Sequence, residues 1–479
     1  MTRTGAETLL ETAKYPAKAH AQRTQALVEQ LEAAGEGGSH GTAGVYFLRA
    51  AKKVYWPFCD QEQPFRQNRY FHYLTGCETA DAYVVYTPAT DRLVLYLPPV
   101  DADDVMWSGM PETLAEALAH YDVDAVKYAD ELAADLAGAG VVRVVEDTLP
   151  EAEPVLAELD AEVVVGGVLV DALDEARAFK DDYELALLRK AAAVSDAAHL
   201  KVLQTLRLPG HVSNETHVHA EFVYHSMRAG SKHQAYDPIC CAGPSCSTLH
   251  YVRNDQDLRA ADGALKQLIL LDAGAEWHTY AADITRTFPV SGVWTPEARE
   301  VYELVLAMQL ACIDRAAPGV LWDDLHALCH RMIVRAFLAW GLFVGGTEDE
   351  IFASRLSAAF LPHGLGHMLG MDTHDPAGHA NYDDPDPMFR YLRIRRTLQP
   401  RMVVTIEPGC YFNPFLIQPY LDDPATARFV DTAVLERYWA VGGVRIEDDV
   451  VITDTGCDVY STVPKHPDEL SKIILAAEA

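Results

Sequence analysis

The chain has 479 residues, of which 49% are apolar, and it carries a formal charge of −31 at pH 7. Single hydrophobic cores stop growing near about 250–300 residues, so this length predicts two domains. The charge argues against a nucleic-acid partner, because such proteins cluster Lys and Arg to displace the counterions of the phosphate backbone. The sequence has no run of 18 uncharged apolar residues, so we expect no membrane span.

The N-terminal segment and the cysteines predict a cytoplasmic protein. Residues 1–22 lack the uninterrupted apolar segment and the small-residue cleavage site of a secretory signal. The nine cysteines are an odd number in a long chain without framework spacing. The segment CCAGPSC (240–246) could in principle bind a metal, but it has no CxxC pair and no second pair to complete four thiolates. We therefore expect buried or incidental thiols there.

Alternating strand and helix patterns predict an α/β (α+β) protein. Residues 15–35 have a helical pattern, and residues 41–170 alternate short apolar runs with alanine-rich helical stretches, which is typical of an α/β domain. Leucines and alanines then recur at three and four residues over 172–207, which predicts one long amphipathic helix at the start of a second domain. We expect the two domains to cover residues 1–175 and 176–479.

The second domain is predicted to contain two more long helices with strands between and after them. One helix covers 295–316, with Thr295 as its N-cap and Pro296 as its first residue, and the other covers 321–342. The Pro- and Asp-rich segment NYDDPDP (381–387) is typical of a surface loop.

Two aspartates, Asp272 and Asp283, lie on apolar β-rich runs that flank AGAEWHTY. If the runs pair as a hairpin centred between Trp277 and His278, the two carboxylates lie opposite one another on the same face. Opposed like charges destabilise an apolar ladder unless a cation lies between them. A bulge that shifts one carboxylate outward explains this pair equally well.

Two later strands also carry acids where a core strand would prefer none. Glu407 follows the apolar run of RMVVTIEPGCYF, and Glu447 lies between two such runs in VGGVRIEDDVVIT. Strand alternation puts Arg445, Glu447 and Asp449 on one face, which is either a solvated surface or the polar lining of a pocket.

Three histidines, His363, His367 and His374, lie in the segment FLPHGLGHMLGMDTHD (360–375). Pro362 and the Gly-Leu-Gly between the first two histidines disfavour a helix, and the glycines favour a backbone that packs tightly or approaches a ligand. A single histidine is more often a hydrogen-bonded core residue than a ligand. Four carboxylates with one imidazole, however, form an oxygen-rich donor set that suits two hard or borderline divalent cations such as Mn²⁺.

Four segments resemble, in order and spacing, the signature segments of the creatinase and aminopeptidase P/prolidase family of pita-bread dinuclear metallopeptidases. They are LDAGAEWHTYAADITRTFP, LPHGLGHMLGMDTHD, VVTIEPG and GGVRIEDD. The N-terminal part, with PFRQNRYFHYLTGCETADAYVVY, is similar to the noncatalytic domain of intracellular eukaryotic-type members. The resemblance implies a creatinase-like N-terminal α/β domain, a C-terminal pita-bread catalytic domain, two divalent metal ions, expected to be Mn²⁺, and a homodimer.

The resemblance also assigns roles to individual residues. It implies five metal ligands, of which the first and the last bridge the two ions: Asp272, Asp283, His367, Glu407 and Glu447. It implies that His250 lies near the scissile peptide, and that His363 and His374 line the substrate pocket and stabilise the intermediate. Arg445 resembles the arginine beside the bridging glutamate, and Tyr236 the tyrosine that supports the metal pocket. A purely structural role is the alternative for these supporting residues.

The implied reaction is metal-dependent hydrolysis of the peptide bond that precedes proline, Xaa-Pro. Two cations that share a bridging water lower the pKa of this water, and one ion polarises the scissile carbonyl. Glu407 is the expected general base, and His374 or His250 is expected to donate hydrogen bonds to the developing oxyanion.

Two substrate classes compete within the family: dipeptides, whose C-terminal carboxylate is recognised, and longer peptides. Arg393 resembles the arginine that holds this carboxylate in prolidase-like members, although other arginines stand nearby, and a guanidinium matches a carboxylate in two hydrogen bonds. We therefore expect an Xaa-Pro dipeptidase (prolidase) that acts on dipeptides or short peptides containing proline. An Xaa-Pro aminopeptidase (aminopeptidase P) that accepts longer peptides is the alternative.

Two other functions within this fold family are a noncatalytic pita-bread binding protein and a metal-free hydrolase of the creatinase type. Both are disfavoured, because the chain keeps all five implied metal ligands. One departure from the family pattern is Arg401, which stands in LQPRM where many relatives have Gly. This residue would alter the turn before Glu407 without touching an expected ligand.

Overall fold

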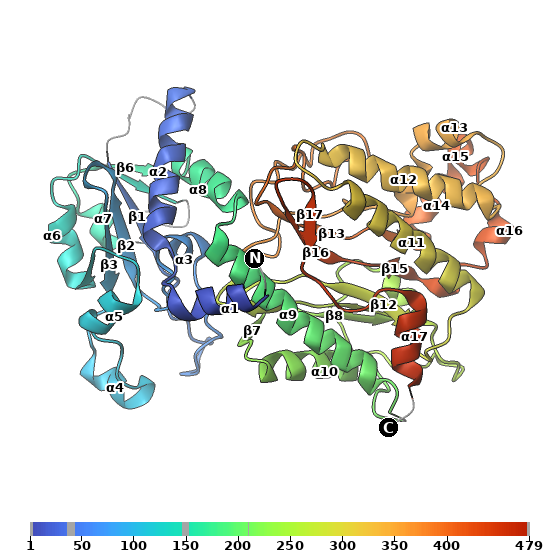
Figure 1. Cartoon of the computed structure of the whole chain (residues 1–479), viewed down its shortest axis with the longest axis horizontal. Coiled ribbons are helices and arrows are strands. Elements are labelled where there is room, and N and C mark those ends of the chain that lie inside the picture. Colours follow the sequence, from blue (N-terminus) through green and yellow to red (C-terminus); the bar gives the residue numbers. More distant parts are fainter. Residues whose placement is uncertain (1–2, 36–43, 146–152, 209, 477–479) are drawn as a thin grey trace. The chain divides into compact units, whose positions relative to one another are not determined.

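The computed structural model describes residues 3–35, 44–145, 153–208 and 210–476. The chain divides into two compact units, Met1–Arg177 and Ala178–Ala479, and Figure 1 shows the elements of each. The mixture of helices with sheets in both units confirms the predicted α/β (α+β) class. Among the described residues, no helix is both long enough and apolar enough to cross a membrane.

The first unit is built on a six-stranded mixed sheet with the strand order β4-β3-β2-β1-β5-β6. β1 pairs antiparallel with β2 and parallel with β5, so the unit combines a β-meander with parallel additions at both edges. Apolar residues of these strands, such as Phe47 and Val142, are fully buried against helix α6. The strands are β1 Val45–Arg49, β2 Tyr83–Thr87, β3 Arg92–Leu97, β4 Ala125–Tyr128, β5 Val141–Val144 and β6 Glu162–Val165.

Short helices connect these strands, and a longer helix precedes them. The predicted helix over 15–35 corresponds to α2, which covers Ala17–Ala33. The other α-helices of this unit are α1 Arg3–Thr12, α3 Arg69–Thr75, α4 Ala102–Ser108, α5 Leu114–His120, α6 Leu132–Leu136, α7 Pro154–Ala157 and α8 Val168–Ala178, whose last residue belongs to the second unit.

The prediction of one helix over 172–207 is wrong, because two helices occupy this stretch. α8 covers Val168–Ala178 and α9 covers Asp182–Thr205. The side chain of Asp181 accepts from the backbone N–H groups of Tyr183 and Glu184, and the carboxylate of Glu184 accepts from the backbone N–H of Asp181. This capping box begins a new helix, because it satisfies N–H groups that a continuous helix would bond to preceding carbonyls.

The second unit contains short, mostly antiparallel strands arranged in small sheets. β12 pairs with β9, β9 with β8, β13 with β16, and β14 with β15. The strands are β7 His233–Gln234, β8 Ile239–Ala242, β9 Leu268–Asp272, β10 Ala275–Trp277, β11 Tyr280–Ala281, β12 Thr285–Pro289, β13 Val403–Ile406, β14 Gly409–Tyr411, β15 Gly443–Arg445, β16 Asp448–Ile452 and β17 Cys457–Val459.

Helices cover these strands on two sides. In Figure 1, α9 and α10 lie on one side of the strands of this unit, and α11 and α12 lie on the other. α11 covers Pro296–Arg315, and the side chain of Thr295 accepts from the backbone N–H of Ala298, which confirms the predicted cap. The remaining helices are α10 Glu215–Arg228, α12 Trp322–Ala339, α13 Glu348–Ala353, α14 Pro414–Asp422, α15 Pro424–Ala427, α16 Thr432–Leu435 and α17 Pro467–Leu475.

The predicted register of the aspartate-bearing strands is wrong by two residues. Asp272 pairs with Thr285 rather than with Asp283, and Trp277 pairs with Tyr280. The turn therefore lies at His278 and Thr279, whose φ angles are +46° and +68°. A two-residue hairpin turn with both φ angles positive matches the twist of the flanking strands, but neither residue belongs to the types that usually mark it.

Candidate active site

A cavity of about 350 Å³ opens in the second unit, and it is lined by residues from distant parts of the sequence. β9 and the segment after β11 contribute Asp272 and Asp283, and the ends of β13 and β15 contribute Glu407 and Arg445. Between Ala359 and Val403, a stretch that the structure describes fully, the chain forms neither helix nor strand, and this stretch supplies the histidines. The predicted absence of a helix between the first two histidines is correct.

His367 lies among carboxylates at the buried end of this cavity. Its Nε2 is 3.2 Å from Asp283 Oδ2, 3.5 Å from Glu407 Oε1 and 3.9 Å from Glu447 Oε1. Its Nδ1 lies 2.9 Å from the carbonyl oxygen of Met368. An Nδ1–H donated to this carbonyl leaves Nε2 unprotonated, with its lone pair directed at the carboxylate cluster, which is the arrangement of a metal-ligating imidazole. Burial also lowers the pKa of His367 to about 4, which favours this neutral form.

Two polar groups hold the aspartates in place. The hydroxyl of Tyr236 lies 2.6 Å from Asp283 Oδ1 and also contacts Asp272 Oδ1, and Arg445 donates to Asp272 Oδ2. A phenol has one proton for two carboxylates, so it can satisfy only one of them at a time. Tyr236 thus contacts the carboxylates directly, and it is not among the residues that line the cavity.

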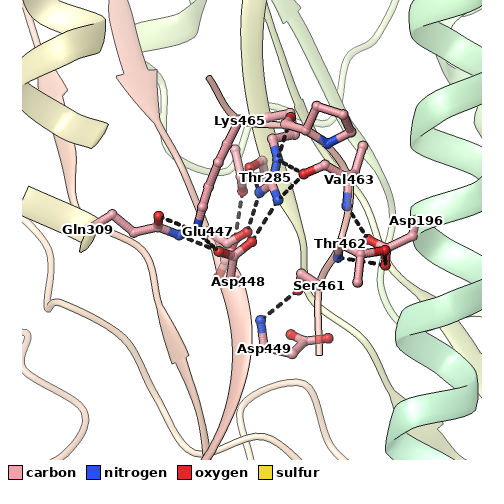
Figure 2. Close-up of polar contacts among 12 residues, drawn as sticks. Asp196, Thr285, Gln309, Glu447, Asp448, Asp449, Ser461, Thr462, Val463 and Lys465 are labelled. Atoms are coloured by element: carbon pink, nitrogen blue, oxygen red, sulfur yellow. Dashed lines mark hydrogen bonds and ion pairs between the residues drawn. The ribbon is translucent and has the colours of Figure 1, made fainter. Parts of the chain in front are cut away.

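The main chain and the carboxylate of Glu447 are both held by residues of β12. The hydroxyl of Thr285 donates to Glu447 Oε2 at 2.6 Å, and Glu447 N–H donates to the carbonyl of Thr285 at 3.1 Å. Arg286, which is fully buried, donates to the carbonyl oxygen of Glu447 at 2.7 Å and to Asp448 Oδ1 at 2.7 Å. Figure 2 shows that Gln309 and Lys465, from two other segments, donate hydrogen bonds to the same Asp448 carboxylate.

The charges of the cluster fit a cation. Burial raises the pKa of Asp283, of Glu407 and of Glu447 well above their ordinary values, and the negative charges of neighbouring carboxylates raise these pKa values further. Such a group of acids is stable without protons only if a positive charge lies between them. One oxygen of Asp283, one oxygen of Glu447 and one nitrogen of His367 lie within 4.8 Å of one another, which is a separation that a single metal ion can bridge.

His363 is engaged differently from His367. Its Nδ1 lies 2.7 Å from the carbonyl oxygen of Gly364, and its Nε2 lies 2.8 Å from the hydroxyl of Tyr411. Arg445 donates to this same hydroxyl at 3.0 Å. Both imidazole nitrogens of His363 therefore have hydrogen-bond partners outside the carboxylate cluster, and its nearest carboxylate oxygen, Glu407 Oε2, is 3.9 Å from Nδ1. Burial and the positive charge of Arg445 lower the pKa of His363 to about 3, so it is neutral near pH 7.

The remaining predicted residues lie along the cavity towards its mouth. His250 and His374 both line it, with their ring centroids 6.3 Å apart, and His374 packs edge-on against His367. Arg393 lines the cavity beside the hydroxyl of Tyr382, at 3.4 Å. Asp449 is not a lining residue: it is buried behind the cavity, where it accepts from the backbone N–H of Asp283. Of the face Arg445, Glu447 and Asp449, only the first two reach the cavity.

Sequence reasoning missed two residues that hold this site together. Tyr411 links His363 to Arg445, and its place four residues after Glu407 could have indicated it, because alternate residues of an extended chain share a face. The second is Lys180, whose ammonium forms a buried ion pair at 2.9 Å with Asp375, the neighbour of His374. No local pattern predicts this pair, since 195 residues separate its members.

Comparison with known proteins identifies the class that this fold and site define, a pita-bread metallopeptidase with an additional N-terminal domain. Residues 186–454 match the model of metallopeptidase family M24, and residues 20–142 match the aminopeptidase P N-terminal domain. A "Probable Xaa-Pro aminopeptidase" of Pyricularia oryzae is 47% identical over 96% of this chain and 97% of its own. An uncharacterized peptidase of Saccharomyces cerevisiae is 45% identical over 96% of this chain and 84% of its own length.

Solved structures agree with these relatives. Aminopeptidase P from Escherichia coli with the inhibitor Pro-Leu matches with a TM-score of 0.78 at 29% identity, over 97% of this chain and 99% of that one. Proline aminopeptidase P II from Yersinia pestis matches with a TM-score of 0.76 at 28% identity, over 95% and 99%. The chain belongs to metallopeptidase family M24 and is a metal-dependent hydrolase with the two-domain fold of aminopeptidase P.

Proposed function

We propose that this protein is an Xaa-Pro aminopeptidase, which removes the N-terminal residue of a peptide when proline follows it. The Pyricularia oryzae relative, which matches over 97% of its length, is named a probable Xaa-Pro aminopeptidase. It supports the alternative of our sequence-based prediction better than the first choice, an Xaa-Pro dipeptidase. Metal-dependent hydrolysis of Xaa-Pro bonds is common to both.

The position of Arg393 supports the same choice. A dipeptidase needs a cation that closes the far end of the pocket around the substrate carboxylate. Arg393 instead is half-buried in the cavity wall, 3.4 Å from the hydroxyl of Tyr382, and the lining residues Tyr382 and Tyr391 are 55% and 56% exposed. A peptide that continues beyond proline can leave the cavity past these residues.

Five residues are proposed to hold two divalent cations: Asp272, Asp283, His367, Glu407 and Glu447. The donor set of four carboxylates and one imidazole suits Mn²⁺ better than thiolate-binding metals. Two such ions supply a hydroxide near neutral pH and polarise the scissile carbonyl. Tyr236, Arg445 and Thr285 orient the carboxylates, and the raised pKa of Glu407 fits a group that takes up the proton of the attacking water.

The histidines are proposed to act on the substrate. His250 and His374 line the same cavity, so either imidazole can donate to the oxygen of the scissile carbonyl as charge develops on it. His363 contacts the peptide while its own orientation is set by Gly364 and Tyr411. We also propose a cytoplasmic homodimer, as the resemblance implies, with proline-containing peptides as its substrates and without a nucleic-acid or membrane partner.

The experiment compares hydrolysis of Gly-Pro and Gly-Pro-Pro by metal-depleted protein that has been reconstituted with Mn²⁺. We expect metal-dependent cleavage with a higher kcat/KM for the tripeptide. A higher kcat/KM for the dipeptide would show that the protein is a dipeptidase instead. Cleavage that does not depend on added metal would contradict the proposed metal site.

A further inference from the structure

The segment 376–396, here called the rim loop, borders the mouth of the cavity without forming a helix or a strand. Fixing a residue of irregular chain costs about 1–2 kcal/mol of conformational entropy, and loops of this length in compact domains are usually functional or disordered. The contacts of the rim loop distinguish these two possibilities.

Ion pairs and buried apolar residues fix the rim loop. Arg355 holds both oxygens of Asp386 at 2.8–3.1 Å, and Arg395 joins Asp384 at 2.8 Å to Asp323 at 2.9 Å. The apolar anchors are Met388, Leu392 and Ile394, which are each at most 3% exposed. These contacts favour an ordered, functional loop over a disordered one.

The fixed loop presents aromatic rings to the cavity. Tyr391 and Arg393 alternate with the buried Leu392 and Ile394, so the alternation directs Tyr391 and Arg393 away from the core. Tyr382 comes from the other arm of the loop and lies 3.4 Å from Arg393. Both tyrosines line the cavity although more than half of the accessible surface of each residue is exposed. Exposed aromatic surface at the edge of a cavity is typical of a ligand-binding position.

The geometry of an aminopeptidase identifies the part of the substrate that reaches these rings. An enzyme that releases a single residue binds the free amine inside the cavity, and only the residues after the scissile bond continue outwards. Proline is the first of them and the third residue of the peptide is the second. We propose that Tyr382 and Tyr391 form a subsite for an apolar side chain at the third residue of the substrate. This inference rests on the proposed function and extends it to the sequence that follows proline.

The test uses C-terminally amidated peptides, which remove any attraction between Arg393 and a terminal carboxylate. We measure kcat/KM of the Mn²⁺-loaded enzyme for Ala-Pro-Leu-amide and Ala-Pro-Gly-amide. One apolar side chain of this size in a partly enclosed subsite typically changes kcat/KM about 10-fold or more. We expect the wild type to prefer the leucine peptide by about 10-fold, and the double variant Tyr382→Ala/Tyr391→Ala to reduce this ratio to about 1–2.

Two control variants distinguish the contribution of the two aromatic rings from the effects of the hydroxyl groups and of removing any exposed tyrosine. Tyr382→Phe/Tyr391→Phe keeps the apolar rings and should keep the ratio. Tyr224→Ala removes a tyrosine on α10 that is 53% exposed and does not line the cavity, and it should leave the ratio unchanged. A wild-type ratio near 1, or a high ratio that survives loss of both rings, would overturn the subsite.

A binding measurement tests the subsite without turnover. Calorimetry compares the affinity of the Mn²⁺-loaded protein for Pro-Leu-amide and Pro-Gly-amide, which correspond to the products of the two reactions. Tighter binding of Pro-Leu-amide that is lost in the double alanine variant supports the subsite. If neither tripeptide amide is cleaved, that result counts against the proposed aminopeptidase activity and leaves the binding result for the subsite unaffected. Equal affinities would overturn the subsite.

Discussion

At the scale of single residues, the two histidines of the HGLGH segment occupy different chemical positions. His367 directs Nε2 at three carboxylates, whereas both nitrogens of His363 are engaged by Gly364 and Tyr411. We expect His367→Ala to lose bound metal and nearly all activity, because it removes a proposed ligand of the ions that would polarise the scissile carbonyl. His363→Ala should retain its metal and lose about 10–100-fold in kcat/KM.

Metal analysis of the two purified variants, together with their kcat/KM values, gives the comparison. Gln substitutions at the same positions serve as controls for cavity volume. Equal loss of metal in both alanine variants would mean that His363 is also a ligand, and would contradict its hydrogen bonds to Gly364 and Tyr411.

Arg401 shows how a residue that departs from the family pattern is accommodated. Its φ angle is +72°, a conformation in which a side chain costs about 1–2 kcal/mol relative to glycine. Its guanidinium donates to the carbonyl of Lys180 at 2.9 Å and to Asp182 at 2.7 Å, contacts that partly offset this cost. Arg401→Ala loses the contacts and keeps the strain, whereas Arg401→Gly loses the contacts and relieves the strain.

We therefore expect Arg401→Gly to be more stable than Arg401→Ala by about 0.5–1 kcal/mol, after allowing for the larger entropy of glycine in the unfolded chain. Urea unfolding of both variants at the same metal loading measures the difference. A less stable glycine variant would show that the left-handed backbone at this position carries no strain.

At the scale of elements, the sequence predicts features that residue types at known spacings signal, and it misses features whose residue types give a weak or conflicting signal. The cap of α11, the absence of a helix in HGLGH and the acids at strand ends follow from residue types at known spacings. The hairpin register fails because His278 and Thr279 adopt left-handed conformations that their residue types do not signal. The break between α8 and α9 has a local signal, the capping box of Asp181 and Glu184, but the recurrence of leucines and alanines at three and four residues continues across it and masks it.

The candidate site follows the same division. Residues with unusual chemistry for a strand or loop, such as Glu407 and Glu447, could be selected from sequence. The Tyr411 hydroxyl between His363 and Arg445, and the rings of the rim loop, could not, because tyrosine is an ordinary core or surface residue until its neighbours are known. Whether Asp449 lines the pocket also depended on the pairing of β16, which buries its carboxylate behind Asp283.

The buried cluster behind β15 and β16 gives a prediction at this scale. Burial alone would raise the pKa of Asp448, but the positive charges of Arg286 and Lys465 hold it below its ordinary value. Asp448→Asn leaves the fully buried Arg286 without its carboxylate, and removal of one partner of a buried ion pair typically costs about 3–5 kcal/mol. Lys465 is 24% exposed, so Lys465→Met should cost less, about 1 kcal/mol.

Urea unfolding of the two variants and of the wild type measures these costs. Because Arg286 also holds the carbonyl of Glu447, Asp448→Asn should in addition weaken binding of the second equivalent of Mn²⁺, as followed by calorimetry under conditions where the variant is folded. Equal destabilisation by the two substitutions would show that the charge of Arg286 is compensated by groups other than Asp448.

At the scale of the whole molecule, stability, metal and pH are coupled through the buried acids. Burial and mutual repulsion raise the pKa values of Asp283, Glu407 and Glu447 in the folded, metal-free protein. The folded state therefore binds protons at these acids more tightly than the unfolded chain does. This contribution to stability is fully present below the ordinary carboxyl pKa of about 4 and is lost as pH rises towards the folded-state values. The formal charge of −31 at pH 7 adds repulsion between like charges, which also lowers the stability of the folded state as pH rises.

Divalent cations bind the deprotonated acids, so stabilisation by metal should have the opposite dependence on pH. We expect the increase in Tm on saturation with Mn²⁺ to be larger at pH 8 than at pH 5.5. At a free Mn²⁺ concentration of about 100 times Kd, binding at one site adds about 2.7 kcal/mol, which corresponds to several degrees. Self-repulsion acts on the metal-free and the loaded protein alike, so the difference between their Tm values isolates the site. Scanning calorimetry at both pH values measures it, with Asp283→Asn as the control in which the pH dependence should shrink. An increase in Tm that is the same at both pH values would mean that these carboxylates do not exchange protons for metal.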